Sequence, residues 1–154
     1  MKKVIFTSLL FAFALFFVGK INAQSVSVNG SIGTVKRGGA TKGSVVLNIP
    51  GGLHVNSSRP NSEYAIPTSV RVTGAGVKLG GVSYPRGRNR KFSFSESTIN
   101  VYEGRAVFSF NVTVPQTFKG NAVKIRAVVR YQACTDEVCY PPKTQEITLT
   151  ANVR

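Results

Sequence analysis

The feature that most constrains the fold is a two-residue alternation of apolar and polar side chains in the second half of the chain. In segment 121–132 one face carries Val123, Ile125, Ala127, Val129 and Tyr131, and the other carries Lys124, Arg126, Arg130 and Gln132. Segments 105–114 and 145–153 alternate in the same way. Because successive side chains of a strand point to opposite faces, the pattern predicts antiparallel strands with one buried face.

Shorter segments of the same kind come before and between these three. The expected strands are 24–36, 43–49, 53–57, 68–73, 76–84, 91–95 and 98–102. Gly, Pro, Asn and Ser separate them, and no stretch long enough for a helix carries an apolar stripe. The sequence therefore predicts an all-β fold, a single immunoglobulin-like antiparallel β-sandwich, with a closed barrel as the next choice.

The first residues have the form of a secretory signal peptide. Two lysines precede the apolar run 5–18, "IFTSLLFAFALFFV", and the small residue Ala23 stands at a suitable cleavage point. The run is short for a membrane anchor, and no second apolar segment follows it. We expect a signal peptide at 1–23 and a mature domain at 24–154 that lacks an integral membrane segment and is periplasmic or secreted. An uncleaved anchor is the alternative.

The chain is strongly basic, with 20 Lys and Arg against 6 Asp and Glu and a net charge of +14. Three of the lysines lie in the expected signal peptide, so the mature chain keeps 17 basic side chains and a net charge of +11. In a cytoplasmic protein such a balance would indicate nucleic acid as a partner. Export argues against nucleic acid and favours acidic proteins, anionic lipid or envelope polymers, or a role in solubility alone.

Both cysteines lie in segment 131–142, "YQACTDEVCYPP", with four residues between them. Two cysteines in an exported protein are usually oxidised together. Cys134 ends one expected strand and the next begins after Pro142, so the chain turns back and can bring the two Cα atoms within the 4.4–6.8 Å of a disulfide. Chain entropy gives so small a ring only about 2 kcal/mol of stability.

A disulfide that adds little stability and lies at an expected loop tip has two interpretations. Exposed bridges are generally the labile, catalytic or regulatory ones, whereas small hairpin-tip bridges also serve as loop braces. Asp136 and Glu137 in the loop would disfavour a thiolate, while Arg130 and Lys143 beside it would favour one. The residues alone leave the redox-active and the inert interpretation open.

The cysteine segment resembles the signature of a known family. "YQACTDEVCYPP" is similar to the Tyr-Gln-x-Cys start and Cys-Tyr-Pro-Pro end found in the amino-terminal periplasmic domain of the thiol:disulfide interchange protein DsbD. Upstream, "IPGGLHVNSSRP" (49–60) and "VSYPRGRNRKFSFSESTINVYEGRAVFSFNVTV" (82–114) resemble family segments in the same order. The cysteine motif is the specific part of the match.

The resemblance implies an immunoglobulin-like sandwich in which Cys134 and Cys139 cycle between dithiol and disulfide by thiolate attack, without a cofactor. It implies thioredoxin-like periplasmic proteins as partners, and we expect Cys139 to be the cysteine that faces them. Full-length family members continue into a membrane domain and a thioredoxin domain, whereas this sequence stops at Arg154. A separate membrane electron donor is therefore expected. Some members have five residues between the cysteines instead of four.

In the family an aromatic cap loop shields the cysteines, with an acidic pair beside it. The corresponding segment here is 88–97, "RNRKFSFSES". Phe92 and Phe94 are the candidate cap residues, but Arg90 and Lys91 stand where acids are expected. A basic cap would favour the thiolate and an acidic partner, but it would not supply a proton acceptor.

Three further side chains are candidates for a place near the cysteines. His54, the only histidine, is either a proton donor at the cysteine site or an ordinary strand histidine. Tyr131 falls on the apolar face and is expected in the core, while Tyr140 is expected to pack against the disulfide or to meet a partner. No metal site is expected, because cysteines four residues apart and one histidine do not match zinc spacing.

A basic cluster is the candidate docking surface, with a plain solvated loop as the alternative. Its members are Arg86, Arg88, Arg90, Lys91 and Arg130. Hydrolase chemistry is excluded, because one histidine, one aspartate and six scattered carboxylates form no catalytic set. The hypothesis is an exported thiol-disulfide relay. Its alternatives are a non-enzymatic binding or structural domain with an inert disulfide and a basic contact face, and a redox-inert chaperone or sensor.

Overall fold

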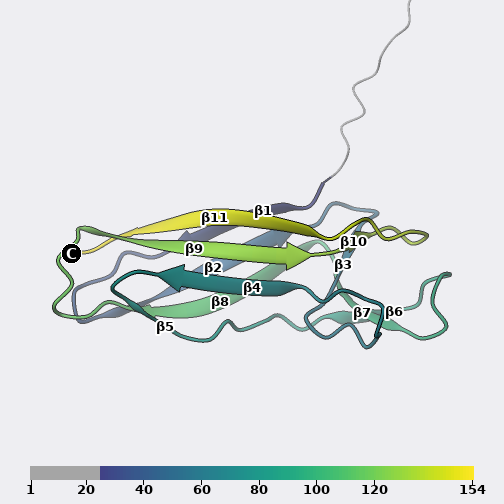
Figure 1. Cartoon of the computed structure of the whole chain (residues 1–154), viewed down its shortest axis with the longest axis horizontal. Helices are drawn as coiled ribbons and strands as arrows, with labels where there is room; N and C mark the ends of the chain where they lie inside the picture. The colour runs from purple at the N-terminus through teal and green to yellow at the C-terminus, as the bar shows by residue number, and fades with distance from the viewer. Residues whose placement is uncertain (1–24) are drawn as a thin grey trace, which may run out of the picture.

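The computed structural model describes residues 25–154, and the expected signal peptide at 1–23 lies outside them (Figure 1). Within this range the chain forms strands and no helix. The strands are β1 (Ser27–Ile32), β2 (Ala40–Asn48), β3 (His54–Asn56), β4 (Ser69–Gly74), β5 (Lys78–Leu79), β6 (Arg88–Arg90), β7 (Ile99–Tyr102), β8 (Arg105–Thr113), β9 (Ala122–Tyr131), β10 (Ala133–Cys134) and β11 (Lys143–Asn152).

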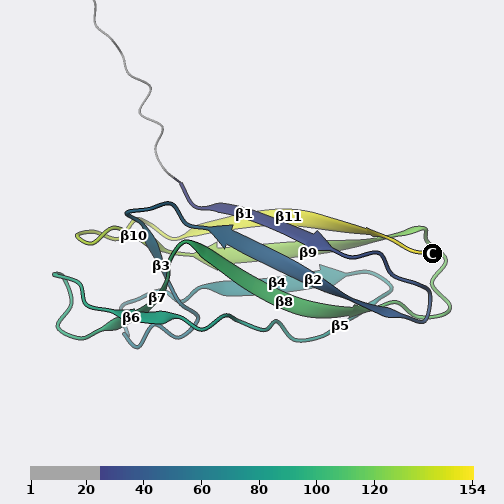
Figure 2. The same cartoon turned by 180° about the vertical axis from the view of Figure 1, so that it is seen from behind.

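The strands form two layers and a smaller sheet at one end. The sheet β11-β9-β4 lies in front in Figure 1, and the sheet β1-β2-β8-β5 lies in front when the molecule is seen from behind in Figure 2. A third sheet, β10-β3-β7-β6, lies at the end of the molecule away from the C-terminus. Every pair of named strands is antiparallel. The predicted immunoglobulin-like β-sandwich is confirmed.

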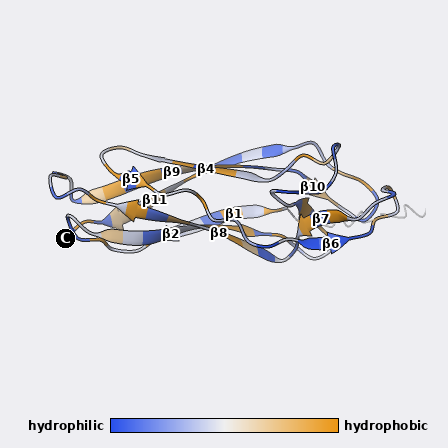
Figure 3. Cartoon of the chain, turned by 90° about the horizontal axis from the view of Figure 1, so that it is seen from below, coloured by the Kyte–Doolittle hydropathy of each residue, from blue (hydrophilic) through white to orange (hydrophobic). Residues whose placement is uncertain are grey.

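The core lies between the two long layers, and the alternation in the sequence accounts for it (Figure 3). Along β9 the side chains from Val123 to Tyr131 alternate between buried and solvent-facing, as predicted. β8 alternates in the same way, and Phe108 at its centre is fully buried with Tyr84 and Tyr102 edge-on against its ring. Full burial of each such apolar side chain contributes about 1.5–3 kcal/mol, so the alternating strands carry most of the stabilisation.

Three expectations about individual strands are wrong. Segment 91–95 is not a strand, because the chain turns there and the amide of Ser95 donates to the carbonyl of Phe92 at 3.2 Å. The expected strand 76–84 is reduced to β5 and an isolated bridge at Ser83, since several glycines interrupt it. Conversely, β6 forms in the segment read as a turn, because its backbone pairs with β7. Local alternation therefore does not decide which short segments find a partner strand.

The end of the molecule that carries the third sheet also carries the cysteine hairpin and the loop that contains Phe92 and Phe94. The hairpin after β10 and the loop between β6 and β7 project from this end in Figures 1 and 2. A second, smaller apolar cluster of Phe92, Ile99 and Val101 lies there. Among residues 25–154 no helix is long and apolar enough to cross a membrane. The candidate site is built on the third sheet, because the strands of this sheet carry Cys134 and both loops.

Candidate functional site

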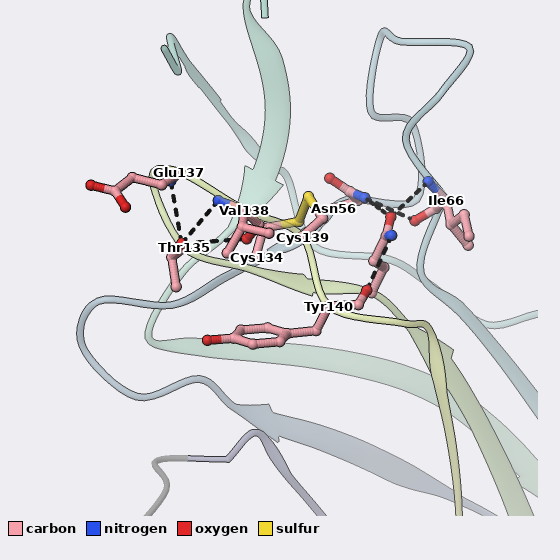
Figure 4. The surroundings of a disulfide bond; sticks show 9 residues. Asn56, Ile66, Cys134, Thr135, Glu137, Val138, Cys139 and Tyr140 are labelled. Atoms are coloured by element: carbon pink, nitrogen blue, oxygen red, sulfur yellow. Dashed lines mark hydrogen bonds between the residues drawn. A yellow bond between two sulfur atoms is a disulfide. The ribbon is translucent and has the colours of Figure 1, made fainter. Parts of the chain in front are cut away.

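Cys134 and Cys139 form a disulfide across the hairpin that follows β10 (Figure 4). The two residues oppose each other as an antiparallel bridge. The amide of Thr135 donates to the carbonyl of Val138 at 2.8 Å and the amide of Tyr140 donates to that of Ala133 at 2.9 Å, so the cysteines occupy a non-hydrogen-bonded pair. Cα atoms approach most closely in such pairs. Their Cα–Cα distance of 4.0 Å is accordingly a little below the expected range.

The turn between the cysteines is held by the side chain of Thr135. Its Oγ1 accepts hydrogen bonds from the backbone amides of Glu137 at 3.2 Å and Val138 at 3.1 Å (Figure 4). A hydroxyl that caps the amides two and three residues later is a common way to stabilise a tight turn. This side chain therefore sets the geometry in which the two sulfur atoms meet, a role that sequence analysis missed.

The two cysteines differ sharply in exposure. Cys134 is 0% exposed and lies on β10, an edge strand of the third sheet, whereas Cys139 is exposed on the outer arm of the hairpin. A disulfide is opened by in-line attack of a thiolate on one of its sulfur atoms, and access decides which one. Of the two cysteines, Cys139 is the more accessible one.

His54 lies directly opposite Cys134 in the antiparallel pairing of β3 with β10. Opposed residues of an antiparallel pair project to the same face of the sheet as near neighbours. His54 is only 2% exposed. The structure thus brings the single histidine to the buried cysteine, although the two lie far apart in the sequence.

The loop between β6 and β7 covers His54 with aromatic rings. Phe92 is buried and stacks on the imidazole, with ring centroids 4.1 Å apart, and Phe94 stacks on Phe92 at 5.3 Å. Phe94 is the outermost ring and is 43% exposed. The hydroxyl of Ser93 donates to the carbonyl of Asp136 at 3.2 Å, which ties this loop to the cysteine hairpin. We call residues 91–96 the aromatic loop.

The basic residues before and in the aromatic loop are partnered within the site. Arg90 forms an ion pair with Glu103 at 2.7 Å, and Lys91 donates to the backbone carbonyl of Glu96. Burial lowers the pKa of His54 below its ordinary value, which the carboxylates of Asp136 and Glu103 oppose and Arg90 reinforces. The site therefore contains carboxylates near the histidine, although they come from segments outside 88–97.

A polar network that sequence analysis missed fixes the base of the hairpin. Gln132 accepts from the Asn56 amide at 3.0 Å and from the backbone amide of Ile66 at 3.3 Å, and it donates to the carbonyl of Tyr140 at 3.2 Å. The Asn56 amide also donates to the carbonyl of Ile66 at 3.2 Å (Figure 4). The alternation in the sequence predicts a solvent-facing position for Gln132 instead. Only the pairing of β3 with β10 reveals its role.

Tyr131 and Tyr140 flank the cysteine segment and line a common hollow. Tyr131 is buried in the core, as predicted. Its hydroxyl accepts a hydrogen bond from the side-chain amide of Gln145 at 2.7 Å and donates one to the backbone carbonyl of Val26 at 3.3 Å. Figure 4 shows the ring of Tyr140 pointing away from the disulfide. Both tyrosines line a mostly apolar hollow of about 320 Å³ with Leu53 and Pro141. Tyr140 is 46% exposed, and the expectation that it packs against the disulfide or meets a partner stays a prediction.

The residues of the predicted docking cluster are all exposed but lie on two different sheets. Arg88 and Arg90 form the ends of β6, an edge strand that appears blue in Figure 3, with Arg86 and Lys91 flanking it. Arg130 projects from β9 in the three-stranded sheet. In the described range no group of three His, Cys, Asp or Glu side chains is placed to hold a metal ion.

Comparison with known proteins gives one family. A sequence model described as the N-terminal region of the thiol:disulfide interchange protein DsbD matches residues 31–151. No curated protein matches the sequence. The reduced DsbD N-terminal domain of Neisseria meningitidis is 20% identical over 82% of this chain and 85% of that one, with a TM-score of 0.46. The N-terminal periplasmic domain of ScsB from Proteus mirabilis is 12% identical over 82% of this chain and 45% of that one, with a TM-score of 0.46.

Proposed function

Since the chain belongs to the family of the N-terminal domain of the thiol:disulfide interchange protein DsbD, we propose that it is an exported thiol-disulfide exchange relay. The observation that carries the proposal is the pairing of an exposed Cys139 with a fully buried Cys134 at a hairpin tip. Such a bridge leaves one sulfur open to attack and keeps the other as an internal leaving group. The chemistry is that of an oxidoreductase without a bound cofactor.

The cycle needs only thiols and one disulfide. A thiolate of a reduced partner attacks Cys139, forms a mixed disulfide and releases Cys134 with the electron pair of the broken S–S bond. A second thiol of the partner then attacks the partner's sulfur in the mixed disulfide and releases Cys139. The domain is now a dithiol, and the partner is a disulfide. In the discharge step Cys139 attacks an oxidised client, and Cys134 closes the ring and releases the reduced client. Two electrons enter the domain in the charging step, and two leave it for the client in the discharge step.

The partners in this proposal are thioredoxin-like periplasmic proteins, with a separate membrane protein as the electron donor. The signal peptide at 1–23 would deliver the domain to the periplasm or outside the cell. The exposed basic side chains at 86–91 lie on and beside β6, at the edge of the third sheet opposite to β10. The aromatic loop that follows them reaches the cysteine hairpin, which favours docking of an acidic partner at this end. Arg130, on another sheet, would extend this contact.

Trapping of a mixed disulfide tests both the exchange and its polarity. Cys134→Ser leaves the exposed thiol free and is expected to accumulate a mixed disulfide with a thioredoxin-like protein whose own resolving cysteine is removed. Cys139→Ser is the matched control, because its remaining thiol is buried, and it should trap at least tenfold less. Equal trapping by both variants would contradict the polarity, and no trapping by either would contradict the relay.

The reduction potential of the disulfide separates the relay from a structural brace. Equilibration in glutathione and dithiothreitol buffers is expected to give a value between roughly −180 and −270 mV, in the range of exchange proteins. A value below about −300 mV would make the bridge too stable for thioredoxin-like proteins to reduce. A non-enzymatic binding domain with an inert disulfide would then be the function.

A further inference from the structure

His54 is a buried polar side chain at the centre of the site, and its chemistry is not used by the exchange cycle as described so far. Its Nε2 atom is buried and has no hydrogen-bond partner among residues 25–154. Buried polar atoms in proteins are nearly always hydrogen-bonded, because leaving one unpaired costs about 1–3 kcal/mol. Phe92 stacks on the face of the imidazole and covers it with an apolar ring. The Nε2 atom of this ring is therefore buried and unpartnered, on a residue that lies opposite Cys134.

The neighbouring Cys134 has a proton-transfer problem. When a partner is bound to Cys139, Cys134 must lose its proton before it can attack, because the thiolate is the nucleophile. Cys134 is 0% exposed, so bulk water does not reach its sulfur. A buried thiol in apolar surroundings resists ionisation. A proton acceptor inside the site would remove this obstacle.

Other ionisable groups near the site are less suited to accept that proton. Asp136 lies in the exposed turn of the hairpin, and Glu103 is held in an ion pair with Arg90. From the aromatic loop the group packed on His54 is the uncharged ring of Phe92. Burial keeps the pKa of His54 below its ordinary value, so at neutral pH the imidazole is in the form that accepts a proton.

We propose that His54 is the proton acceptor for Cys134 when Cys134 resolves a mixed disulfide. The proposal rests on the proposed exchange function and adds a step to it. The proton moves from Cys134 to the imidazole, and the Cys134 thiolate attacks Cys139. The Cys134–Cys139 bond forms, the bond between Cys139 and the partner breaks, and the partner leaves as a thiolate with the electron pair. The imidazolium then returns the proton to solvent or to the leaving thiolate.

The reverse reaction uses the same residue as a donor. When a partner thiolate attacks Cys139 in the oxidised domain, Cys134 departs as a thiolate in a dry environment. His54 takes up the proton that the attacking partner thiol or solvent gives up, and it passes this proton to Cys134. One residue thus serves both directions of exchange, as microscopic reversibility requires.

A chromogenic disulfide, 5,5′-dithiobis(2-nitrobenzoate), resolves the two steps without a protein partner. The reduced domain releases one thionitrobenzoate when Cys139 forms the mixed disulfide and a second when Cys134 resolves it. His54→Phe retains an aromatic ring for Phe92 to stack on and removes both nitrogens. At pH 7 the second phase is expected to slow by roughly 100-fold, in the usual range for loss of a general base, while the first is unchanged.

A second variant guards against a purely structural effect. In His54→Ala, added imidazole is expected to fill the space and restore the second phase by at least tenfold, whereas a packing defect would not respond to it. Equal slowing of both phases in His54→Phe, or an unchanged second phase, would overturn the proposal. Absence of rescue in a folded His54→Ala protein would also overturn it. Because the probe is a small disulfide, the assay remains readable if thioredoxin-like proteins fail to form a mixed disulfide.

Discussion

The chemistry of the site depends on a few single residues whose surroundings differ from those of their neighbours in sequence. Cys134 and Cys139 are the same residue type five positions apart, yet one is sealed in a sheet and the other faces solvent. His54 lies beside the sealed one under the ring of Phe92. Burial thus gives two chemically identical cysteines different access to solvent, and it lowers the pKa of the imidazole.

The buried histidine predicts a specific loss of stability in acid. The unfolded chain binds a proton at His54 near pH 6.5, whereas the folded protein, whose pKa is lowered by burial, binds it only at lower pH. Below about pH 6.5 the unfolded state therefore holds more protons, and the free energy of unfolding falls as pH falls, by at most about 1.4 kcal/mol per pH unit for this group. Above that pH the contribution is fully present.

Urea unfolding between pH 8 and pH 4.5 measures this effect. The matched control is His54→Phe, in which this component of the pH dependence is expected to disappear while the contributions of the carboxylates remain. The difference between the two proteins isolates the histidine. If both lose stability in parallel as the pH falls, His54 is not kept neutral by the fold.

At the scale of elements, the long strands require small residues where side chains of neighbouring strands meet. Gly43 on β2 is buried and pairs with Phe110 on β8. A Cβ atom at this position would overlap the end of the Phe110 ring. The close approach of β2 to β8 therefore depends on a glycine. These two strands are the central pair of the sheet β1-β2-β8-β5.

Substitution of this glycine is expected to destabilise the sandwich. Gly43→Ala should lower the free energy of unfolding by about 1–3 kcal/mol, because the added methyl group forces the Phe110 ring or the backbone to move. Gly51→Ala is the matched control, since nothing lies within 4 Å of a Cβ atom there. Denaturant unfolding of both variants decides the matter. Equal stability of the two proteins would show that Phe110 moves aside without cost.

At the scale of the whole molecule, the shape and the charge distribution distinguish the end that carries the cysteine hairpin. The molecule is elongated, and the cysteine hairpin projects from the end away from the C-terminus (Figure 1). Of the 6 acidic residues in the chain, Glu103 and Glu146 are in ion pairs with arginines. Excess positive charge of this size steers encounters with acidic proteins and is screened by salt. The exposed side chain of Lys91 begins the aromatic loop, and that of Arg88 lies on β6 just before it.

Charge reversal at this end is expected to slow exchange with an acidic thioredoxin-like partner. The double variant Arg88→Glu with Lys91→Glu should lower the second-order rate several-fold to tenfold at low ionic strength, and the difference should vanish near 0.5 M salt. The control Lys36→Glu with Lys119→Glu changes the net charge equally at exposed positions elsewhere. Stopped-flow exchange measures the rates. Equal slowing in both double variants would show that only total charge matters.

The sequence by itself determined the β-sandwich, the buried faces of its long strands and the pairing of the two cysteines. Each of these follows from local information. A period of two reports which face of a strand is buried, as along β9, and only two cysteines are available to pair. The short segments were predicted less well, because a strand of two or three residues exists only where a partner strand lies beside it, as β6 does beside β7.

Only the tertiary structure decided how the site is assembled. The pairing of β3 with β10 sets His54 opposite Cys134, and it turns Gln132 from an apparent surface residue into the anchor of the hairpin. A loop predicted as a strand instead folds over the histidine. These contacts join residues that are distant along the chain, so their cause is the register of strands and the packing of rings against them. No local pattern of side chains carries that information.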